Sequence, residues 1–135
     1  MKIIFMDVDG VLNTLEGTVN PKLVAIFRNI LTNIDAKVVL SSSWKNYEAS
    51  RNIIKMSVCD FIDCTPQVLI EGRDSTQRRG MEIQAWIDKH PDVEKYAIID
   101  DTGWILEHQL PNFFKTLGSI GLTQEIAEKV IEHLK

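Results

Sequence analysis

Acidic side chains stand in pairs directly after two short apolar segments of this 135-residue chain. Asp7 and Asp9 follow the first of these segments, and Asp100 and Asp101 follow the second. Carboxylates in this arrangement can attack an electrophile, transfer protons or bind a hard cation through oxygen. Four of them brought together would repel one another and raise some of their pKa values unless a cation is present. We therefore expect a site for a divalent cation, with Mg²⁺ the best match, and this combination suits phosphate chemistry.

The hydrophobic pattern indicates a scaffold that unites these distant segments. Short apolar runs typical of buried strands occupy residues 2–6, 38–40, 61–62, 96–99 and 113–117. Apolar residues at helical spacing predict helices over about 23–34, 47–56 and 79–89 and a last helix after Thr123. Asn20 and Pro21 provide an N-cap and a first-turn proline for the first helix. The alternation predicts an α/β fold: a three-layer, Rossmann-like parallel sheet with helices on both faces, forming a single domain over residues 1–135.

Ligands of open parallel sheets lie beyond the carboxyl ends of the strands, so polar residues that directly follow a predicted strand are candidates for the site. One further strand ends in hydroxyl groups, since Ser41, Ser42 and Ser43 follow the apolar run at 38–40. We expect one of these serines to join the carboxylates and another to cap the helical segment that follows. Ser42 is preferred for the site and Ser41 is the alternative, because the end of the strand is uncertain by one or two residues.

The composition is that of an ordinary globular protein, with 44% hydrophobic and 25% charged residues. Its 15 basic and 19 acidic residues give a net charge of −4, which excludes a basic nucleic-acid surface over the whole protein but not a local basic patch. Cys59 and Cys64 form neither a disulfide framework nor a zinc spacing. No apolar run is long enough for a signal peptide or a membrane span. We therefore expect a cytoplasmic protein without a membrane partner and leave its oligomeric state open.

Four segments occur in a fixed order along the chain: FMDVDGVLN at 5–13, VVLSSSW at 38–44, RGMEI at 79–83 and IIDD at 98–101. In this order they resemble the four signatures of the haloacid dehalogenase (HAD) superfamily of phosphohydrolases. The Ser-Ser-Trp sequence, Thr65-Pro66, the RGMEI segment and Gly121-Leu122-Thr123 are further similar to small HAD phosphatase domains, which are found alone in phages and bacteria or within RNA-repair proteins. The resemblance implies a HAD-like phosphatase that acts on a phosphorylated substrate.

The same resemblance implies a role for each candidate residue. Asp7 would be the nucleophile that forms an aspartyl-phosphate. Asp9 would be the general acid and then the base that activates water. Its presence favours a phosphatase, because the dehalogenases of the superfamily lack this second acid. Arg79, with Arg78 as the alternative, would neutralise the phosphoryl charge and hold Asp7 ready.

Metal and substrate contacts complete the site that the resemblance implies. The expected Mg²⁺ ligands are Asp7, Asp9, Asp100 and Asp101. Asp101 is favoured as the direct ligand, with Asp100 binding through water or to Arg79. Ser42 would donate a hydrogen bond to the phosphoryl oxygens. The further residues expected to contact the substrate are Ser41, Gly10, Arg78 and Arg73. Arg73 belongs to a polar segment at 67–78 that would either grip a second phosphate or stay solvated.

The lengths of the intervening segments indicate that the inserted cap domain of many HAD proteins is essentially missing. Between Asp9 and Ser41 there is room for one loop, one helix and one strand, and between Ser43 and Arg79 for one helix, a short strand and a polar loop. An open site of this kind often goes with large substrates in the superfamily. Polynucleotide ends and phosphoproteins are therefore candidates, and small phosphomonoesters remain an option.

Two other functions are compatible with acids on an α/β sheet. A receiver-like domain would accept a phosphoryl group on an aspartate, and a binding domain would keep the fold without turnover. The order of the acidic pairs disfavours the first, and the complete catalytic set disfavours the second. Trp44 and Trp104, which each follow a strand, are expected to pack at the edge of the sheet, with stacking on a nucleobase as the alternative.

Overall fold

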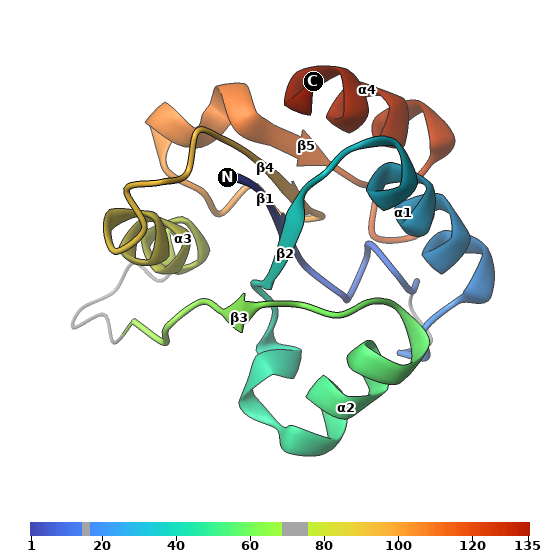
Figure 1. Cartoon of the computed structure of the whole chain (residues 1–135). Coiled ribbons are helices and arrows are strands. Elements are labelled where there is room, and N and C mark those ends of the chain that lie inside the picture. The colour runs from blue at the N-terminus through green and yellow to red at the C-terminus, as the bar shows by residue number, and fades with distance from the viewer. Residues whose placement is uncertain (15–16, 69–75) are drawn as a thin grey trace.

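A five-stranded parallel sheet forms the centre of the computed structural model, which describes residues 1–14, 17–68 and 76–135 (Figure 1). The strands are β1 (Lys2–Met6), β2 (Lys37–Leu40), β3 (Asp63–Cys64), β4 (Lys95–Asp100) and β5 (Phe113–Lys115). Their order across the sheet is β3-β2-β1-β4-β5, and every neighbouring pair is parallel. The predicted Rossmann-like α/β fold is confirmed.

The first and last α-helices begin where the sequence places their caps. In the described part of the chain they are α1 (Pro21–Asn33), α2 (Glu48–Ser57), α3 (Arg78–Asp88), α4 (Gln124–Leu134) and the 3₁₀-helices η1 (Ser43–Asn46) and η2 (Glu107–Asn112). Asn20 caps α1 by accepting a hydrogen bond from the N–H of Lys22 at 2.9 Å, and Thr123 caps α4 through the N–H of Ile126 at 3.2 Å. Among the residues described, no helix combines the length and the apolar character needed to cross a bilayer.

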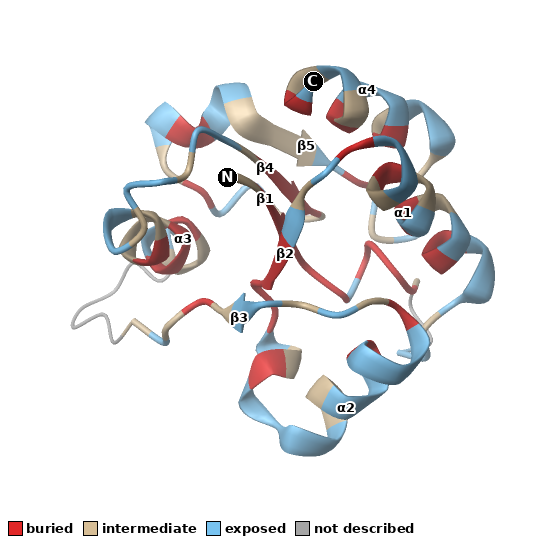
Figure 2. Cartoon of the chain, in the orientation of Figure 1, coloured by how far each residue is buried: buried red, intermediate tan, exposed pale blue. Residues whose placement is uncertain are grey.

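The two faces of the sheet are covered by different helices, because alternate residues of a strand point to opposite faces. Ile4 and Met6 of β1 join the larger core cluster, to which α1 and α4 also contribute. Ile3 and Phe5 join the smaller cluster together with Ile83 of α3. Accordingly, α1 and α4 lie beside each other on one side of the sheet and α3 lies on the other (Figure 1). Most of β1 and β4 is buried (Figure 2), as expected for a parallel sheet covered on both faces.

The two edge strands differ from their predicted ranges. β3 begins two residues later than predicted. The two apolar residues of the predicted strand precede it: Phe61 packs against the core and Ile62 is half exposed. β5 ends at Lys115 instead of residue 117, because Leu117 opens a turn that closes on Gly121 through a bridge and a backbone hydrogen bond of 2.7 Å. Edge strands are short and pair on one side only, so an apolar run is a weak guide to where they start and stop.

The register of the central strands brings the polar residues to one edge of the sheet. Met6 of β1 pairs with Leu40 of β2 and with Ile99 of β4. The ladder continues one step further through two hydrogen bonds of 3.0 Å, one from the N–H of Asp7 to the carbonyl of Ile99 and one from the N–H of Ser41 to the carbonyl of Met6. Because β1 lies between β2 and β4, Asp7 stands in the middle of this edge.

Candidate active site

Three carboxylates meet at the carboxyl ends of β1 and β4. Asp7, Asp100 and Asp101 each offer an oxygen, and these atoms all lie within 4.8 Å of one another. Asp7 is 5% exposed and Asp100 is fully buried, whereas Asp101 is partly exposed. A compact group of oxygen donors with one member open to solvent is the kind of site that Mg²⁺ prefers, since this ion keeps part of its water shell.

Arg79, in the first turn of α3, is the cation beside these acids. Its Nη1 donates to Asp100 Oδ2 at 2.5 Å and lies 3.3 Å from Asp7 Oδ1. Arg78 is held elsewhere, because its Nε donates to the carbonyl of Val68 at 3.1 Å. Of the two candidate arginines, the fold therefore brings Arg79 to the acids and leaves Arg78 with the polar segment before α3.

Gly80 lets α3 approach the segment after β4. A Cβ at Gly80 would lie 2.5 Å from the backbone nitrogen of Leu106 and 2.7 Å from the Cα of Ile105. The N–H of Gly80 donates to the carbonyl of Trp104 at 2.9 Å, and its own carbonyl accepts from Gln109 Nε2 at 2.9 Å. This close contact, one residue after Arg79, fixes the position of the first turn of α3 and with it the position of the guanidinium beside the acids.

Burial and mutual repulsion oppose the ionisation of the cluster. The pKa of Asp7 is raised well above its usual value, first by burial and then by the charge of Asp100, although Arg79 acts in the opposite direction. The pKa of Asp101 is also raised, by burial and by Asp100. Three carboxylates against one guanidinium hold an excess of negative charge, which a divalent cation would offset. The charge and the oxygen donors of these residues therefore fit Mg²⁺.

Asp9 stands apart from the cluster. Its side chain is exposed, and Oδ1 accepts hydrogen bonds from Asn13 Nδ2 at 2.9 Å and from the indole Nε1 of Trp44 at 3.1 Å. Asp9 was a predicted Mg²⁺ ligand, but the group of described acids with converging oxygens does not include it, so the fold does not bring its side chain to the three other carboxylates. An exposed carboxylate steered by two donors is well placed to exchange a proton with a bound molecule.

Gly10 makes room for Asp101. Its φ of +80° lies in the left-handed region, and a Cβ there would collide with the carboxylate of Asp101. Its N–H donates to Asn13 Oδ1 at 2.9 Å, and its carbonyl accepts from Thr116 Oγ1 at 2.7 Å. Both polar groups of Gly10 thus already have partners within the protein, and the predicted substrate contact finds no support in this geometry.

The serines after β2 divide their tasks. Ser42 caps η1, because its Oγ accepts from the N–H of Trp44 at 3.2 Å. The expectation that one serine of this segment acts as a cap is confirmed. Ser41 is fully buried, and its Oγ finds no hydrogen-bond partner within the described part of the chain. The Ser42 hydroxyl only accepts in this bond and keeps its own proton to donate. Ser41 is nevertheless the one of the two whose Oγ has no partner in the described chain, which favours it for the site over Ser42.

Several supporting residues were not singled out from the sequence. Thr102 holds Asp100 by donating both its N–H and its hydroxyl to Oδ1, each at 2.9 Å. The sequence did contain a hint for Asn13, because it is a polar residue directly after the apolar pair Val11-Leu12 of the first signature. Thr116 had none, since only folding brings it to Gly10. Arg73, a predicted substrate contact, lies outside the residues that the structure describes.

A buried ion pair joins the segment after β2 to α3. Lys45 Nζ donates to Glu82 Oε1 at 2.9 Å and to Thr65 Oγ1 at 2.9 Å, and the side chains of Lys45 and Glu82 are 7% and 6% exposed. The other oxygen of Glu82 accepts from the N–H of Val68 at 3.0 Å. Because Glu82 lies one helical turn after Arg79, this pair ties the arginine's helix to the serine segment.

A comparison with protein families agrees with this site. The family described as "HAD domain in Swiss Army Knife RNA repair proteins" matches residues 3–127, a span that contains the acids, Arg79 and both serines. No curated protein and no solved structure matches the chain significantly. The match covers most of the chain, and the five-stranded parallel sheet with helices on both faces is consistent with this family. The chain therefore belongs to the HAD superfamily, in the family of HAD domains of Swiss Army Knife RNA repair proteins.

Proposed function

We propose that this protein is a Mg²⁺-dependent phosphatase that hydrolyses phosphomonoesters through an aspartyl-phosphate on Asp7. The observation that carries the proposal is the arrangement of two aspartates two residues apart. Asp7 lies in the acidic cluster 3.3 Å from Arg79, whereas Asp9 is held outside it by Asn13 and Trp44. This arrangement supports attack by Asp7 and proton transfer by Asp9.

In the first step, a carboxylate oxygen of Asp7 attacks phosphorus and the bond from phosphorus to the ester oxygen breaks. Asp9, in its acid form, donates a proton to the departing oxygen. Arg79 holds the Asp7 carboxylate in place and offsets the phosphoryl charge together with the hydroxyl of Ser41. Mg²⁺ held by Asp7, Asp100 and Asp101 would supply charge neutralisation at the phosphoryl oxygens.

In the second step, water attacks the phosphorus of the aspartyl-phosphate. Asp9, now a carboxylate, takes a proton from this water, and the bond between Asp7 and phosphorus breaks to release inorganic phosphate. The two donors on Asp9 Oδ1 keep the carboxylate oriented in both steps while leaving its other oxygen to exchange the proton.

Among the candidate substrates we favour the end of an RNA strand, because the matching family is described as HAD domains in RNA repair proteins. The test is release of phosphate with Mg²⁺ from a panel of p-nitrophenyl phosphate, nucleotides, 3′- and 5′-phosphorylated oligonucleotides and a phosphopeptide. We expect turnover of at least one phosphorylated oligonucleotide above that of the phosphopeptide. A preference for the phosphopeptide would contradict the RNA assignment, and no release from any member would contradict the phosphatase.

Replacement of Asp9 should separate proton transfer from attack. Asp9→Asn cannot protonate the leaving group, so we expect a loss of about 10²- to 10⁴-fold in kcat for alkyl phosphates, whose leaving groups are poor. The leaving group of p-nitrophenyl phosphate departs with little protonation, so kcat for this substrate should fall much less. Steady-state kinetics on both substrates checks this. Equal losses on the two would mean that Asp9 is not the general acid.

Mg²⁺ should stabilise the fold through the acidic cluster. A ligand that binds only the folded state at a hundredfold excess over its Kd adds about 2.7 kcal/mol to the free energy of unfolding. We therefore expect Mg²⁺ to raise Tm and EDTA to abolish phosphatase activity. Asp101→Asn should remove most of the shift in Tm, whereas Glu128→Gln, an exposed acid on α4, should retain it. Activity that persists in EDTA would show that the cluster does not work with a metal.

A further inference from the structure

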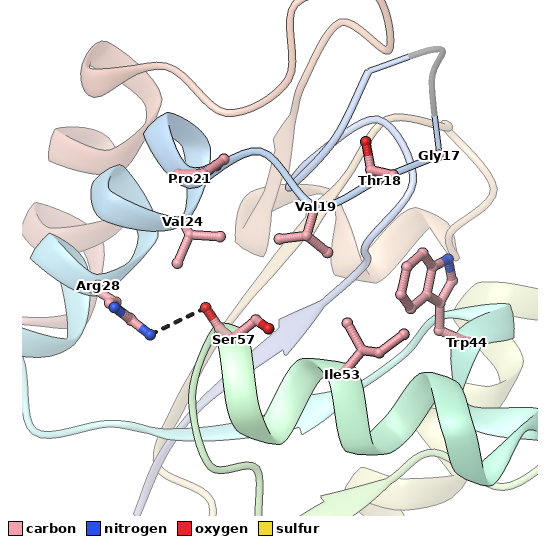
Figure 3. Close-up of a pocket in the computed structure, with 9 residues that line it drawn as sticks. All are labelled: Gly17, Thr18, Val19, Pro21, Val24, Arg28, Trp44, Ile53 and Ser57. Carbon is pink, nitrogen blue, oxygen red and sulfur yellow. Dashed lines mark hydrogen bonds between the residues drawn. The ribbon is translucent and has the colours of Figure 1, made fainter.

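A cavity of about 470 Å³ lies between the segment before α1, α1 itself and α2, with Trp44 in its wall (Figure 3). Its volume falls within the range of small-molecule sites. Its walls combine the apolar side chains of Val19, Val24 and Ile53 with the indole of Trp44. Ile53 is 45% exposed, which is high for an isoleucine and leaves its side chain open to a bound molecule.

Trp44 connects this cavity to the candidate active site. Its Nε1 donates to Asp9 Oδ1 at 3.1 Å, and its ring forms a wall of the cavity. Figure 3 shows the indole nitrogen on the side of the ring turned away from Val19 and Ile53. The ring also packs against the larger core cluster, as the sequence predicts, so its position is fixed. Because the nitrogen that binds Asp9 lies on the far side of the ring, the indole of Trp44 stands between a molecule in the cavity and the Asp9 carboxylate.

Polar groups at the rim add hydrogen-bonding capacity. Thr18 and Ser57 line the cavity together with Arg28. Arg28 donates from Nε to the carbonyl of Val58 at 2.7 Å and from Nη2 to the carbonyl of Ser57 at 3.1 Å. These two bonds hold the guanidinium at the rim and use two of its five N–H donors. A flat, apolar, hydrogen-bonding molecule with a nearby negative charge matches this lining.

We propose that the cavity binds the base of the nucleotide that carries the scissile phosphate, with the base stacked on Trp44. This inference rests on the proposed phosphatase function and names its substrate more closely. The leaving group of a phosphorylated RNA end is a nucleoside, attached at the oxygen that Asp9 would protonate, and the cavity begins on the other side of the indole that binds Asp9. Aromatic stacking is tolerant of base identity, so recognition of this kind would accept all four bases. Arg28 would face the backbone phosphate of the next nucleotide.

A pair of substrates tests the inference. One is an oligonucleotide phosphorylated at the end that the wild-type protein hydrolyses, and the other is the same oligonucleotide with an abasic sugar at that end. We expect the wild type to prefer the first by about 5- to 150-fold in kcat/KM, the range that stacking on an aromatic side chain supports. Ile53→Trp would fill the cavity and bring this preference close to one. Asn52→Trp adds the same indole at the neighbouring exposed position of α2, outside the lining, and should keep the preference.

Failure of the inference and failure of the phosphatase function are distinguishable in this experiment. If the wild type hydrolyses both substrates with equal kcat/KM, the cavity does not hold the base, although the phosphatase function stands. If the wild type hydrolyses no phosphorylated oligonucleotide and no other phosphomonoester, the phosphatase function itself is wrong. A preference that Ile53→Trp leaves intact, with thermal unfolding showing a folded variant, would place the base elsewhere. Equal hydrolysis of the two substrates by the wild type would overturn the inference even if the variant does not fold.

Discussion

Asp7→Asn is expected to abolish phosphate release while the protein stays folded. The amide keeps the shape of the side chain but cannot attack phosphorus, and loss of a nucleophile of this kind costs at least about 10⁴-fold in kcat. The pKa of Asp7 is raised in the folded state, so its contribution to the free energy of unfolding is lost as pH rises from the unfolded value through the raised one. A neutral Asn has no such dependence. We therefore expect the metal-free variant to be at least as stable as the wild type at pH 7.

Phosphate release measured with Mg²⁺ checks the first expectation, and thermal unfolding measured in EDTA checks the second. Asp88→Asn is a suitable control, because this residue lies at the end of α3 away from the acids and its side chain contacts Gln84. It should leave turnover and Tm close to wild type. If Asp7→Asn still releases phosphate at the wild-type rate, the nucleophile has been assigned to the wrong residue. If the metal-free variant is clearly less stable than the wild type, the repulsion inferred within the cluster is wrong.

Lys45→Met is expected to cost about 3–5 kcal/mol of the free energy of unfolding, the usual result of leaving one partner of a buried ion pair alone. Glu82 would keep its hydrogen bond from Val68 but would face no cation at Oε1. Because Glu82 lies three residues after Arg79, phosphatase activity should fall as well. Urea unfolding measures the first effect, and steady-state kinetics of the folded fraction measures the second.

Two further variants show whether the loss comes from the buried charge. Lys45→Met combined with Glu82→Gln removes both charges, and we expect it to recover most of the stability lost in the single variant. Lys129→Met breaks an exposed pair with Glu125 of 3.6 Å on α4, where both side chains are more than half exposed, and should cost well under about 1 kcal/mol. A Lys45→Met protein as stable as Lys129→Met would show that the buried pair contributes little.

The sequence was most informative where local chemistry and global fold agree. Apolar runs that end in acids predicted β1 and β4, since a strand buried on both faces needs continuous apolar residues and a polar residue can follow only at its end. Asn20, Pro21 and Thr123 predicted helix starts, because a cap is a contact between residues two or three positions apart. The edge strands were placed less well, since their pairing partners and not their own residues set their limits.

The sequence by itself therefore determined the parallel α/β fold, because adjacent parallel strands must end at one edge of the sheet. It predicted that four carboxylates converge there, of which Asp7, Asp100 and Asp101 do and Asp9 does not. Only the tertiary structure separated Arg79 from Arg78 and placed Asp9 beside Trp44, 35 positions away along the chain. Both results depend on the direction in which a side chain points from a helix or a loop after packing. Two neighbouring arginines have the same chemistry, so the residue type alone does not show which of them reaches the acids. The pairing of Lys45 with Glu82 was decided in the same way, because its stability comes from burial between segments that meet only in the folded protein.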